Sequence, residues 1–440
     1  MKYIFITILI LCGLAPDAAA KSYYKKVVVE RQLAPGATYT EYRMGPGSKK
    51  RAVHVVEIDL VNAYLSVGVL KAGESNRALA KLHEIVRYFD SLNNYKVLAA
   101  VNANFWRAYG NYPIGPTVAG GEVIEMGSYK EWSAVFFDTL SRPYFSNFKM
   151  TGFVIAKNGD TLHLASVNRR RDTADRCLYN RFAGDTIPRI RGSDIRDKLA
   201  EALADTSYRD ITDMELDTAA LRDEIIKIER ESSAEFANAK ARLIYIDRPG
   251  VNKRIRCRVA KIDTGSHSTE GGCLISAGAS GFPAAMLAPG DTVIVEFRTN
   301  ELSNIEFRES VCGTPRLVRN GRAEHEAQTE GSTGRRFIRH ALPRSAIGAN
   351  RARSKIYLVA VEGNSRSRQT RGASLADMAR IMHALGAYDA INLDGGGSTS
   401  MVIDNKNVAS PLRPDAGRSI SVGLGLILRN PPNLKNFFQK

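Results

Sequence analysis

The chain has 440 residues with a formal net charge of +16, and 44% of its residues are hydrophobic. This composition is that of a globular protein with a real core, long enough for two or three ordinary domains or one large one. The cysteines after residue 20 are too scattered for a zinc ribbon, which excludes that class; they are Cys177, Cys257, Cys273 and Cys312. Four cysteines permit three disulfide pairings, and four unpaired buried thiols are the alternative.

The first twenty residues have the pattern of a secretory signal peptide. A short basic start, Met1-Lys2, precedes an apolar run over residues 3–14, and Ala18-Ala19-Ala20 supplies small residues at the cleavage positions. The run is too short to cross a bilayer, and no later stretch is long enough for a transmembrane segment. We therefore expect export, to the periplasm or out of the cell, with cleavage near Ala20.

The basic charge then indicates the kind of partner. Outside the cytoplasm a strongly basic surface favours anionic glycans, phosphate polymers or acidic lipid surfaces. Nucleic acid is not an expected partner there. A generic basic surface with no specific partner is the alternative.

Short strands are predicted through most of the first half of the chain. Residues 21–96 form a β-rich region of short β-branched and aromatic runs, with a short helix at about Leu79–Leu92. A buried strand follows at Val97–Val101, and residues 112–170 continue in short strands. Apolar residues then recur at helical spacing in an acidic segment, so we expect a peripheral helical insertion at about 193–240.

A strand, a helix and a second strand are predicted at 355–394. Ile356–Val361 is a continuous apolar run typical of a buried strand. Ser374 begins a helix with a capping box, Gly386 ends it, and Ala390–Leu393 forms the next strand. This order predicts a right-handed βαβ unit with parallel strands. The expected fold class is therefore α+β, with mixed sheets of short strands, a C-terminal βαβ unit and the helical insertion.

Two carboxylates follow the two strands of this unit. Glu362 ends the first strand, and Asp394 ends the second, followed by Gly395, Gly396, Gly397 and Ser398. Ligands bind outside the carboxyl ends of parallel strands, and ends of directly neighbouring strands lie only about 5 Å apart. The glycines let the backbone approach a ligand and turn N–H groups toward an anion. A tight turn between strands is the alternative.

Amides and arginines lie at other expected strand ends. Asn102 and Asn104 follow the strand at 97–101 and precede two aromatic rings, a set that suits a sugar, although a turn with Asx hydrogen bonds would look similar. Arg316 and Arg344 each follow a proline, and an arginine fork matches phosphate oxygens. Exposed arginines with no ligand are the alternative.

The motifs that are missing limit the cofactors. The sequence has no His-Glu-x-x-His, no Gly-x-Ser-x-Gly and no EF-hand loop. Its seven histidines do not cluster at metal-ligand spacing. No cofactor is therefore expected, with a carboxylate-bound structural calcium left open.

These blocks, in this order, resemble the phosphodiester glycosidase family. The family ending Asn-Leu-Asp-Gly-Gly-Gly-Ser is matched at 392–398, Pro-Arg-Thr-Ala-Ile-Gly at 343–348 with one change, and Gly-x-Pro-Arg-Leu-Val at 313–318. An Asn-Gly-Gly-Tyr/Phe-Phe element is similar to 102–106, and Glu362 stands where the family usually has Asp. The implied order is a signal peptide at 1–20, the β-rich region at 21–96, a phosphodiester glycosidase-like domain at 97–428 and a C-terminal tail at 429–440.

The resemblance implies hydrolysis of the bond between a sugar's anomeric carbon and a phosphodiester oxygen. The transition state then needs a carboxylate near the oxocarbenium-like carbon and stabilisation of the departing phosphate. Asp394 fits the first task, with Glu362 as its partner. Arg316, Arg344 and the amides of 395–397 fit the second.

The expected protein is thus an exported hydrolase that acts on a phosphate-linked glycan or another anionic polymer of the cell envelope, releasing free sugar and a phosphomonoester. Two alternatives stay open. One is a non-catalytic envelope protein that binds anionic glycan. The other is a phosphodiesterase that cuts the P–O bond. The sequence does not decide the sugar, the acceptor, or retention against inversion of the anomeric carbon.

Overall fold

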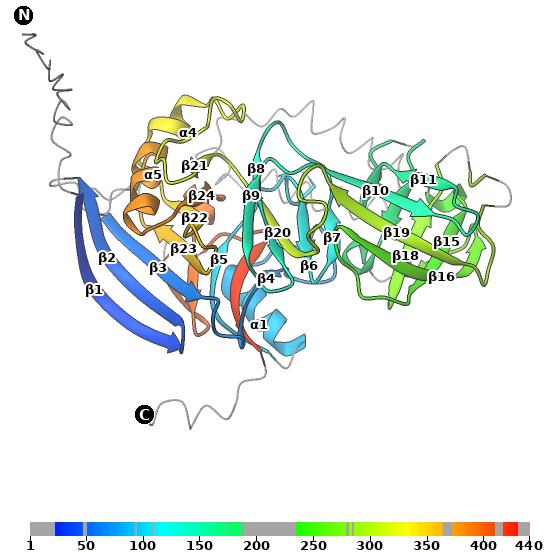
Figure 1. Ribbon diagram of the computed structural model, residues 1–440, viewed down its shortest axis with the longest axis horizontal. Coiled ribbons are helices and arrows are strands. Elements are labelled where there is room, and N and C mark those ends of the chain that lie inside the picture. Colours follow the sequence, from blue (N-terminus) through cyan, green and yellow to red (C-terminus); the bar gives the residue numbers. More distant parts are fainter. Residues whose placement is uncertain are drawn as a thin grey trace, which may run out of the picture.

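The computed structural model shows an elongated molecule made of several packed sheets (Figure 1). It describes residues 23–46, 51–92, 95–107, 110–172, 174–184, 186–187, 235–278, 281–283, 286–363, 372–409 and 417–429. The predicted signal peptide, all but the end of the predicted helical insertion at 193–240, and the tail after Arg429 lie outside these residues.

The fold is mostly β, so the prediction of an α+β fold is wrong. The α-helices with assigned bounds in the described ranges are α1 (Leu82–Leu92), α4 (Arg335–Arg339) and α5 (Leu375–Ala384). Among the described strands, nearly all neighbours pair antiparallel, and β12 with β13 is the parallel pair. Antiparallel neighbours can be joined by short turns, whereas parallel neighbours need long crossovers that are usually helical. The strand–helix–strand order at 355–394, from which the α+β fold was predicted, is therefore not typical of the rest of the described chain.

A seven-stranded sheet at one end of the molecule carries the predicted strand–helix–strand segment. Its strands in spatial order are β1 (Tyr23–Ala34), β2 (Ala37–Pro46), β3 (Arg51–Asp59), β23 (Lys355–Val361), β22 (Arg344–Ala349), β24 (Asp389–Asn392) and β21 (Arg316–Val318). Helix α5 begins at the predicted cap Ser374, with its capping box, and buries Met378 and Met382 against one face.

The predicted βαβ unit is interrupted by a strand from elsewhere in the chain. β22 pairs antiparallel with both β23 and β24, so these two strands run in the same direction without being neighbours. The predicted separation of about 5 Å required directly neighbouring strands, and β23 and β24 are not direct neighbours. Two strand spacings, about 10 Å, separate the backbones. Glu362 and Asp394 still follow strands that end on the same edge of the sheet.

Two five-stranded sheets complete the core beside this one. The first contains β26 (Lys406–Ala409), β25 (Met401–Ile403), β5 (Lys96–Asn102), β27 (Gly423–Leu428) and β4 (Leu65–Leu70). The second contains β7 (Glu122–Glu125), β6 (Thr117–Ala119), β20 (Phe307–Gly313), β8 (Ser133–Asp138) and β9 (Pro143–Ser146). Helix α1 confirms the short helix predicted there, and it buries Ile85 and Val86 against the first of these sheets.

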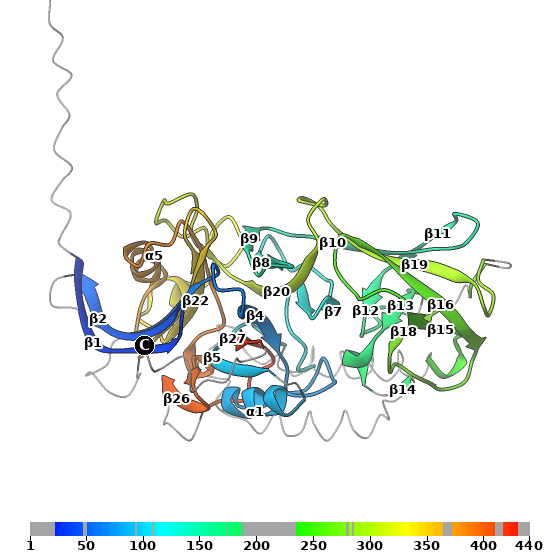
Figure 2. The same ribbon diagram turned by 60° about the horizontal axis from the view of Figure 1, so that its bottom comes forward.

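The β20 sheet is buried on both faces. Phe137 and Val311 join the core shared with the other two sheets, whereas Phe136 and Phe307 join a second core. The second core lies under an eight-stranded sheet at the other end of the molecule (Figure 2). That sheet contains β11 (Thr161–Leu164), β10 (Met150–Ile155), β19 (Thr292–Thr299), β16 (Lys253–Asp263), β15 (Lys240–Tyr245), β18 (Gly272–Ser276), β13 (Cys177–Tyr179) and β12 (Ser166–Val167). A small two-stranded sheet, β14 (Thr186–Ile187) and β17 (His267–Ser268), lies apart from the rest.

The four cysteines after residue 20 are buried free thiols. This matches the unpaired alternative left open by the sequence. No helix in the described ranges is long and apolar enough to cross a membrane.

Candidate active site around Asp394

The loop that follows β24 is held on three sides by backbone hydrogen bonds. The N–H of Leu393 donates to the Ser345 carbonyl at 2.9 Å, and that of Asp394 donates to the Ala103 carbonyl at 2.8 Å. Gly396 then adopts a φ of 58°, in the left-handed region that favours glycine, and begins a short 3-10 helix to Ser398. The sequence after Asp394 is therefore a tight, anchored turn as well as a candidate ligand loop.

The Asp394 carboxyl group is buried inside this turn. The residue is 8% exposed, and its Oδ1 accepts the Gly395 N–H at 2.8 Å. Burial raises the pKa of Asp394 to about 6, although the Ser398 hydroxyl, the Arg418 charge and the Gly395 N–H lower it. The carboxylate is thus mostly ionised at pH 7 and can serve as a base or a nucleophile.

The side chain of Asn102 ties the Asp394 loop to two strands. Its Nδ2 donates to the Asp394 carbonyl at 2.7 Å, and its Oδ1 accepts the Ser345 hydroxyl at 2.5 Å and the Ser400 N–H at 3.0 Å. Asn102 is 1% exposed, so all of these bonds are shielded from water. Its oxygen and its nitrogen both bond groups of the protein, which gives this buried amide a positioning role.

Asn104 also donates its amide N–H groups within the protein. Nδ2 bonds the Ile114 carbonyl at 3.1 Å and the Thr117 hydroxyl at 2.9 Å, while the buried Oδ1 has no hydrogen-bond partner among the described residues. The two aromatic residues that follow it are half-buried. Phe105 contacts Trp132, and the Arg418 guanidinium lies 5.5 Å from the Trp106 ring.

Arg344 lies directly beneath the glycine loop. A Cβ on Gly395 would stand 3.8 Å from the Arg344 Cα and Cδ, and the Gly396 N–H donates to the Pro343 carbonyl. The guanidinium donates to the carbonyls of Ala373 and Phe337 and lies 5.0 Å from the Phe337 ring. It is 1% exposed, and no carboxylate of the described ranges pairs with it.

Burial lowers the pKa of Arg344 to about 9, which still leaves it charged at neutral pH. A buried cation without a counterion is costly to the fold. Such a charge beside an anchored glycine loop is well suited to meet an anionic group of a ligand.

Arg316 is placed differently from Arg344. Its Nη2 donates to Asp389 at 2.6 Å, and Asp389 begins β24, so the guanidinium points away from the end of the strand where Asp394 lies. Its backbone N–H donates to the buried carboxylate of Glu330, which also accepts the hydroxyls of Ser133 and Thr314. Arg316 is thus engaged in an internal ion pair.

Glu362 lies on the far side of β22 from Asp394, in contact with β3. Its Oε1 is 3.0 Å from the Nε2 of His54, whose Nδ1 is 2.9 Å from the Tyr39 hydroxyl. Burial raises the pKa of Tyr39 to about 12, so this phenol stays protonated. The Glu362 side chain is 28% exposed, and His54 fixes its direction.

The structure therefore brings together Asp394, the glycine loop, Asn102 and Arg344, and it separates Arg316 and Glu362 from them. Sequence reasoning missed several residues that contact predicted site residues or their neighbours, because these residues belong to no motif; they are His54, Trp132, Glu330 and Phe337. Arg418 was not among the predicted site residues, although its charge lowers the pKa of Asp394. In the described part of the chain no cluster of three or more His, Cys, Asp or Glu residues is arranged to hold a metal ion.

Replacing Asn102 tests its positioning role. We expect Asn102→Ala to lower the free energy of unfolding by at least about 2 kcal/mol, because each buried group left unsatisfied costs about 1–3 kcal/mol. Urea denaturation of the purified protein measures this. Asn158→Ala, at an exposed turn, serves as the matched control and should change stability much less. Equal stability of the Asn102 variant and the wild type would contradict the role.

Comparisons with solved structures find proteins that share this fold. The solved structure of a hypothetical protein from Synechocystis is similar, with a TM-score of 0.61 and 20% identity, over 94% of this chain and 65% of that one. A putative exported protein from Burkholderia pseudomallei gives a TM-score of 0.53 and 19% identity, over 87% and 75%. Both likenesses concern the fold alone.

Sequence comparison also finds a relative whose name states the reaction that it catalyses. An N-acetylglucosamine-1-phosphodiester alpha-N-acetylglucosaminidase of Bos taurus is 31% identical over 113 residues, which are 24% of this chain and 21% of the relative. The chain therefore aligns with about a fifth of that relative's length. The family model described as phosphodiester glycosidase matches residues 251–427, which include Arg344 and Asp394. This part of the chain is therefore similar to the phosphodiester glycosidase family.

Proposed function

We propose that the Asp394 loop is the active site of an exported hydrolase that cleaves a sugar from a phosphodiester-linked glycan at the anomeric C–O bond. The products would be free sugar and a phosphomonoester. The observation that carries the proposal is the buried Asp394 carboxyl group in a glycine loop that lies against the stem of Arg344, a buried arginine without a carboxylate partner in the described ranges. Both lie within the part of the chain that matches the family model.

The chemistry assigns different tasks to these two groups. A phosphate leaving group is a weak base, so it needs stabilisation of its charge more than it needs a strong acid. Arg344 supplies that charge from under the loop. Asp394, ionised at neutral pH, faces the oxocarbenium-like carbon as nucleophile or as base for a water.

The glycine loop supplies fewer free amides than its sequence implies. The N–H of Gly395 donates to Asp394, and that of Gly396 donates to Pro343. We assign the remaining loop-glycine amide, the N–H of Gly397, to the leaving phosphate. The Ser398 hydroxyl then donates a hydrogen bond to the Asp394 carboxylate rather than to the substrate.

Glu362 stays a candidate for the second carboxylate, but not as a close partner of Asp394. The two side chains follow strands separated by β22, a spacing of about 10 Å between backbones. Retaining enzymes hold their carboxyl groups about 5–5.5 Å apart, and inverting enzymes leave more room for a water. The wider spacing favours inversion if Glu362 takes part.

Export and an envelope glycan as substrate are parts of the same proposal. The predicted signal peptide at residues 1–20 supports export, as does the likeness to a protein described as exported. The net charge of +16 suits an anionic polymer. The curated relative acts, by its name, on an N-acetylglucosamine phosphodiester, which makes that sugar the first substrate to test.

Hydrolysis in oxygen-18 water tests the reaction. With the methyl diester of N-acetylglucosamine 1-phosphate as substrate, we expect free sugar that carries the label and methyl phosphate that does not, measured by mass spectrometry. Label in the phosphate would show P–O cleavage and contradict the proposal. No product from this or other sugar phosphodiesters would favour a binding protein.

The Asp394→Asn variant tests the carboxylate. Asn keeps the size and a neutral hydrogen bond but removes the charge, so kcat should fall by at least about 10²-fold while substrate still binds. Steady-state kinetics and the melting temperature measure the two effects separately. Asp404→Asn, which removes an exposed carboxylate from the turn after β25, is the control and should keep its kcat. A well-folded Asp394→Asn protein with normal kcat would remove Asp394 from the mechanism.

The pH dependence distinguishes a base or nucleophile from an acid. Because burial raises the pKa of Asp394 to about 6, its carboxylate forms as the pH rises through that value. We therefore expect kcat/KM to rise between about pH 5 and 7 and then level off, since the phosphodiester stays ionised throughout. A profile that falls over this range would mean that Asp394 acts as a proton donor.

A further inference from the structure

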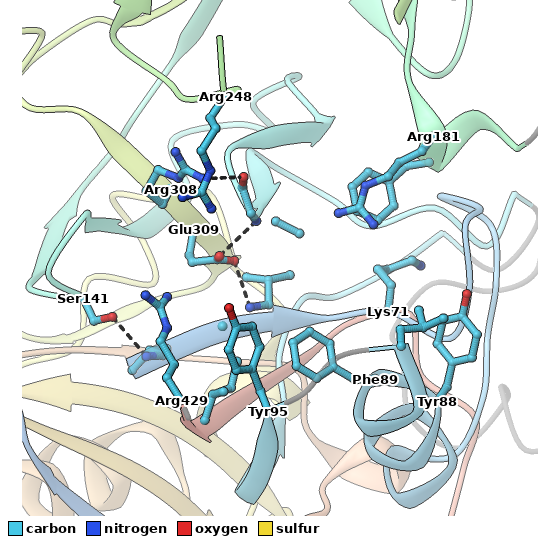
Figure 3. A pocket seen from close by; sticks show the side chains of 18 of the residues that line it. Lys71, Tyr88, Phe89, Tyr95, Ser141, Arg181, Arg248, Arg308, Glu309 and Arg429 are labelled. Carbon is cyan, nitrogen blue, oxygen red and sulfur yellow. Dashed lines mark hydrogen bonds between the residues drawn. The ribbon is translucent and has the colours of Figure 1, made fainter. Parts of the chain in front are cut away.

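A pocket lies away from the Asp394 loop, where β20 meets the β4 sheet and helix α1 (Figure 3). It encloses about 420 Å³, and no residue of the segment 394–400 lines it. Glu309 of β20 lies at its centre in Figure 3 and accepts the N–H groups of Val69 and Gly120 at 3.0 and 2.9 Å. These bonds join β20 to β4 and to the residue that follows β6, so the backbone around Glu309 is fixed by the fold.

Arginines gather on the walls of this pocket. Arg308 donates to the Gly120 carbonyl at 3.1 Å and pairs with Glu306 at 3.4 Å, and Arg181 pairs with Glu122. Arg248 and Arg429 line the same space and have no ion-pair partner in the described ranges. The lining has five basic residues against three acidic ones.

The acidic members of the lining cancel only part of this charge. Glu74 lies 3.9 Å from Arg181, and burial lowers the pKa of Lys71 to about 7, so Lys71 is only partly charged at neutral pH. Asp138 is already paired with Arg142 at 2.7 Å. Burial raises the pKa of Glu309 to about 7, so this carboxyl is only partly ionised at neutral pH. The space between Arg248, Arg308 and Arg429 is therefore positive.

The wall opposite Arg248 and Arg308 carries aromatic rings, with Arg429 beside Tyr95 on the same side (Figure 3). Phe89 of α1 and Tyr95, which follows this helix, point into the pocket from the side facing Arg248 and Arg308 (Figure 3). Tyr95 is 39% exposed and Leu92 is 56% exposed, so apolar surface is left open to solvent here. Aromatic rings of this kind pack against the C–H face of a sugar, while guanidinium forks bind phosphate.

We propose that this pocket binds a phosphorylated sugar at a second site, separate from the Asp394 loop. Arg248, Arg308 and Arg429 hold the phosphate, and Tyr95 and Phe89 pack against the sugar ring. The site requires no turnover, so it goes beyond the proposed reaction and does not depend on it.

Calorimetric titration of the full chain tests the site with three probes: glucose 1-phosphate, inorganic phosphate and methyl glucoside. These probes contain no phosphodiester, so failure of the proposed hydrolysis would not affect the result. We expect glucose 1-phosphate to bind more tightly than inorganic phosphate, and methyl glucoside to bind far more weakly. The double variant Arg248→Gln/Arg429→Gln should weaken glucose 1-phosphate at least about tenfold, because charge-assisted hydrogen bonds to phosphate are strong ones.

The matched control removes two arginines elsewhere. Arg254 and Arg258 are exposed on β16 and have no ion-pair partner in the described part of the chain, so Arg254→Gln/Arg258→Gln should bind the probes as the wild type does. Equal loss in both double variants would mean that only net charge matters and would overturn the site. Unchanged binding in Arg248→Gln/Arg429→Gln would overturn it as well.

A third variant separates the sugar wall from the phosphate wall. Tyr95→Ala should weaken glucose 1-phosphate about tenfold and leave inorganic phosphate unchanged, since only the sugar packs on the ring. Circular dichroism and the melting temperature check that each variant folds. Equal affinity of Tyr95→Ala and wild type for glucose 1-phosphate would overturn the assignment of a sugar.

Discussion

The candidate active site depends on the hydrogen bonds of one buried amide, that of Asn102. This side chain joins the end of β5 to Ser345 on β22 and to the backbone at Asp394 and Ser400. Two different sheets meet at this point, because β5 and β22 belong to separate sheets. An amide can donate and accept at once, so one side chain fixes the carbonyl of Asp394 and the turn that follows it. The position of the carboxylate is therefore set by the packing of two sheets rather than by its own loop.

Two buried charges near this point carry a desolvation cost that the fold offsets only in part. The pKa of Asp394 is raised by burial, and Arg344 is held by two carbonyls without a carboxylate in the described ranges. Arg316, by contrast, is neutralised by Asp389. A fold selected for stability alone would pair or remove an isolated buried charge. The contrast between the two arginines supports the proposal that Arg344, rather than Arg316, stabilises an anionic group.

Strand β20 connects this site to the arginine-lined pocket. Glu309 lies at the pocket, and Gly313, at the end of the same strand, would place a Cβ 2.2 Å from the Asn392 carbonyl before the Asp394 loop. Four residues of extended strand span about 13 Å. The Asp394 loop and the pocket are thus held at a fixed separation by a strand that is buried on both faces.

Local pattern in the sequence determined the elements and the reactive loop. The helices at Leu82–Leu92 and Leu375–Ala384 and the turn at Asp394 follow from apolar spacing, a capping box and glycines, which act within a few residues. Only the tertiary structure decided the sheet order and the neighbours of Asp394. Asn102 and Asp394 are 292 positions apart, and β22 enters between β23 and β24 from an earlier part of the chain. Such pairings depend on which distant strands share a core, and periodicity within one strand does not encode its neighbours.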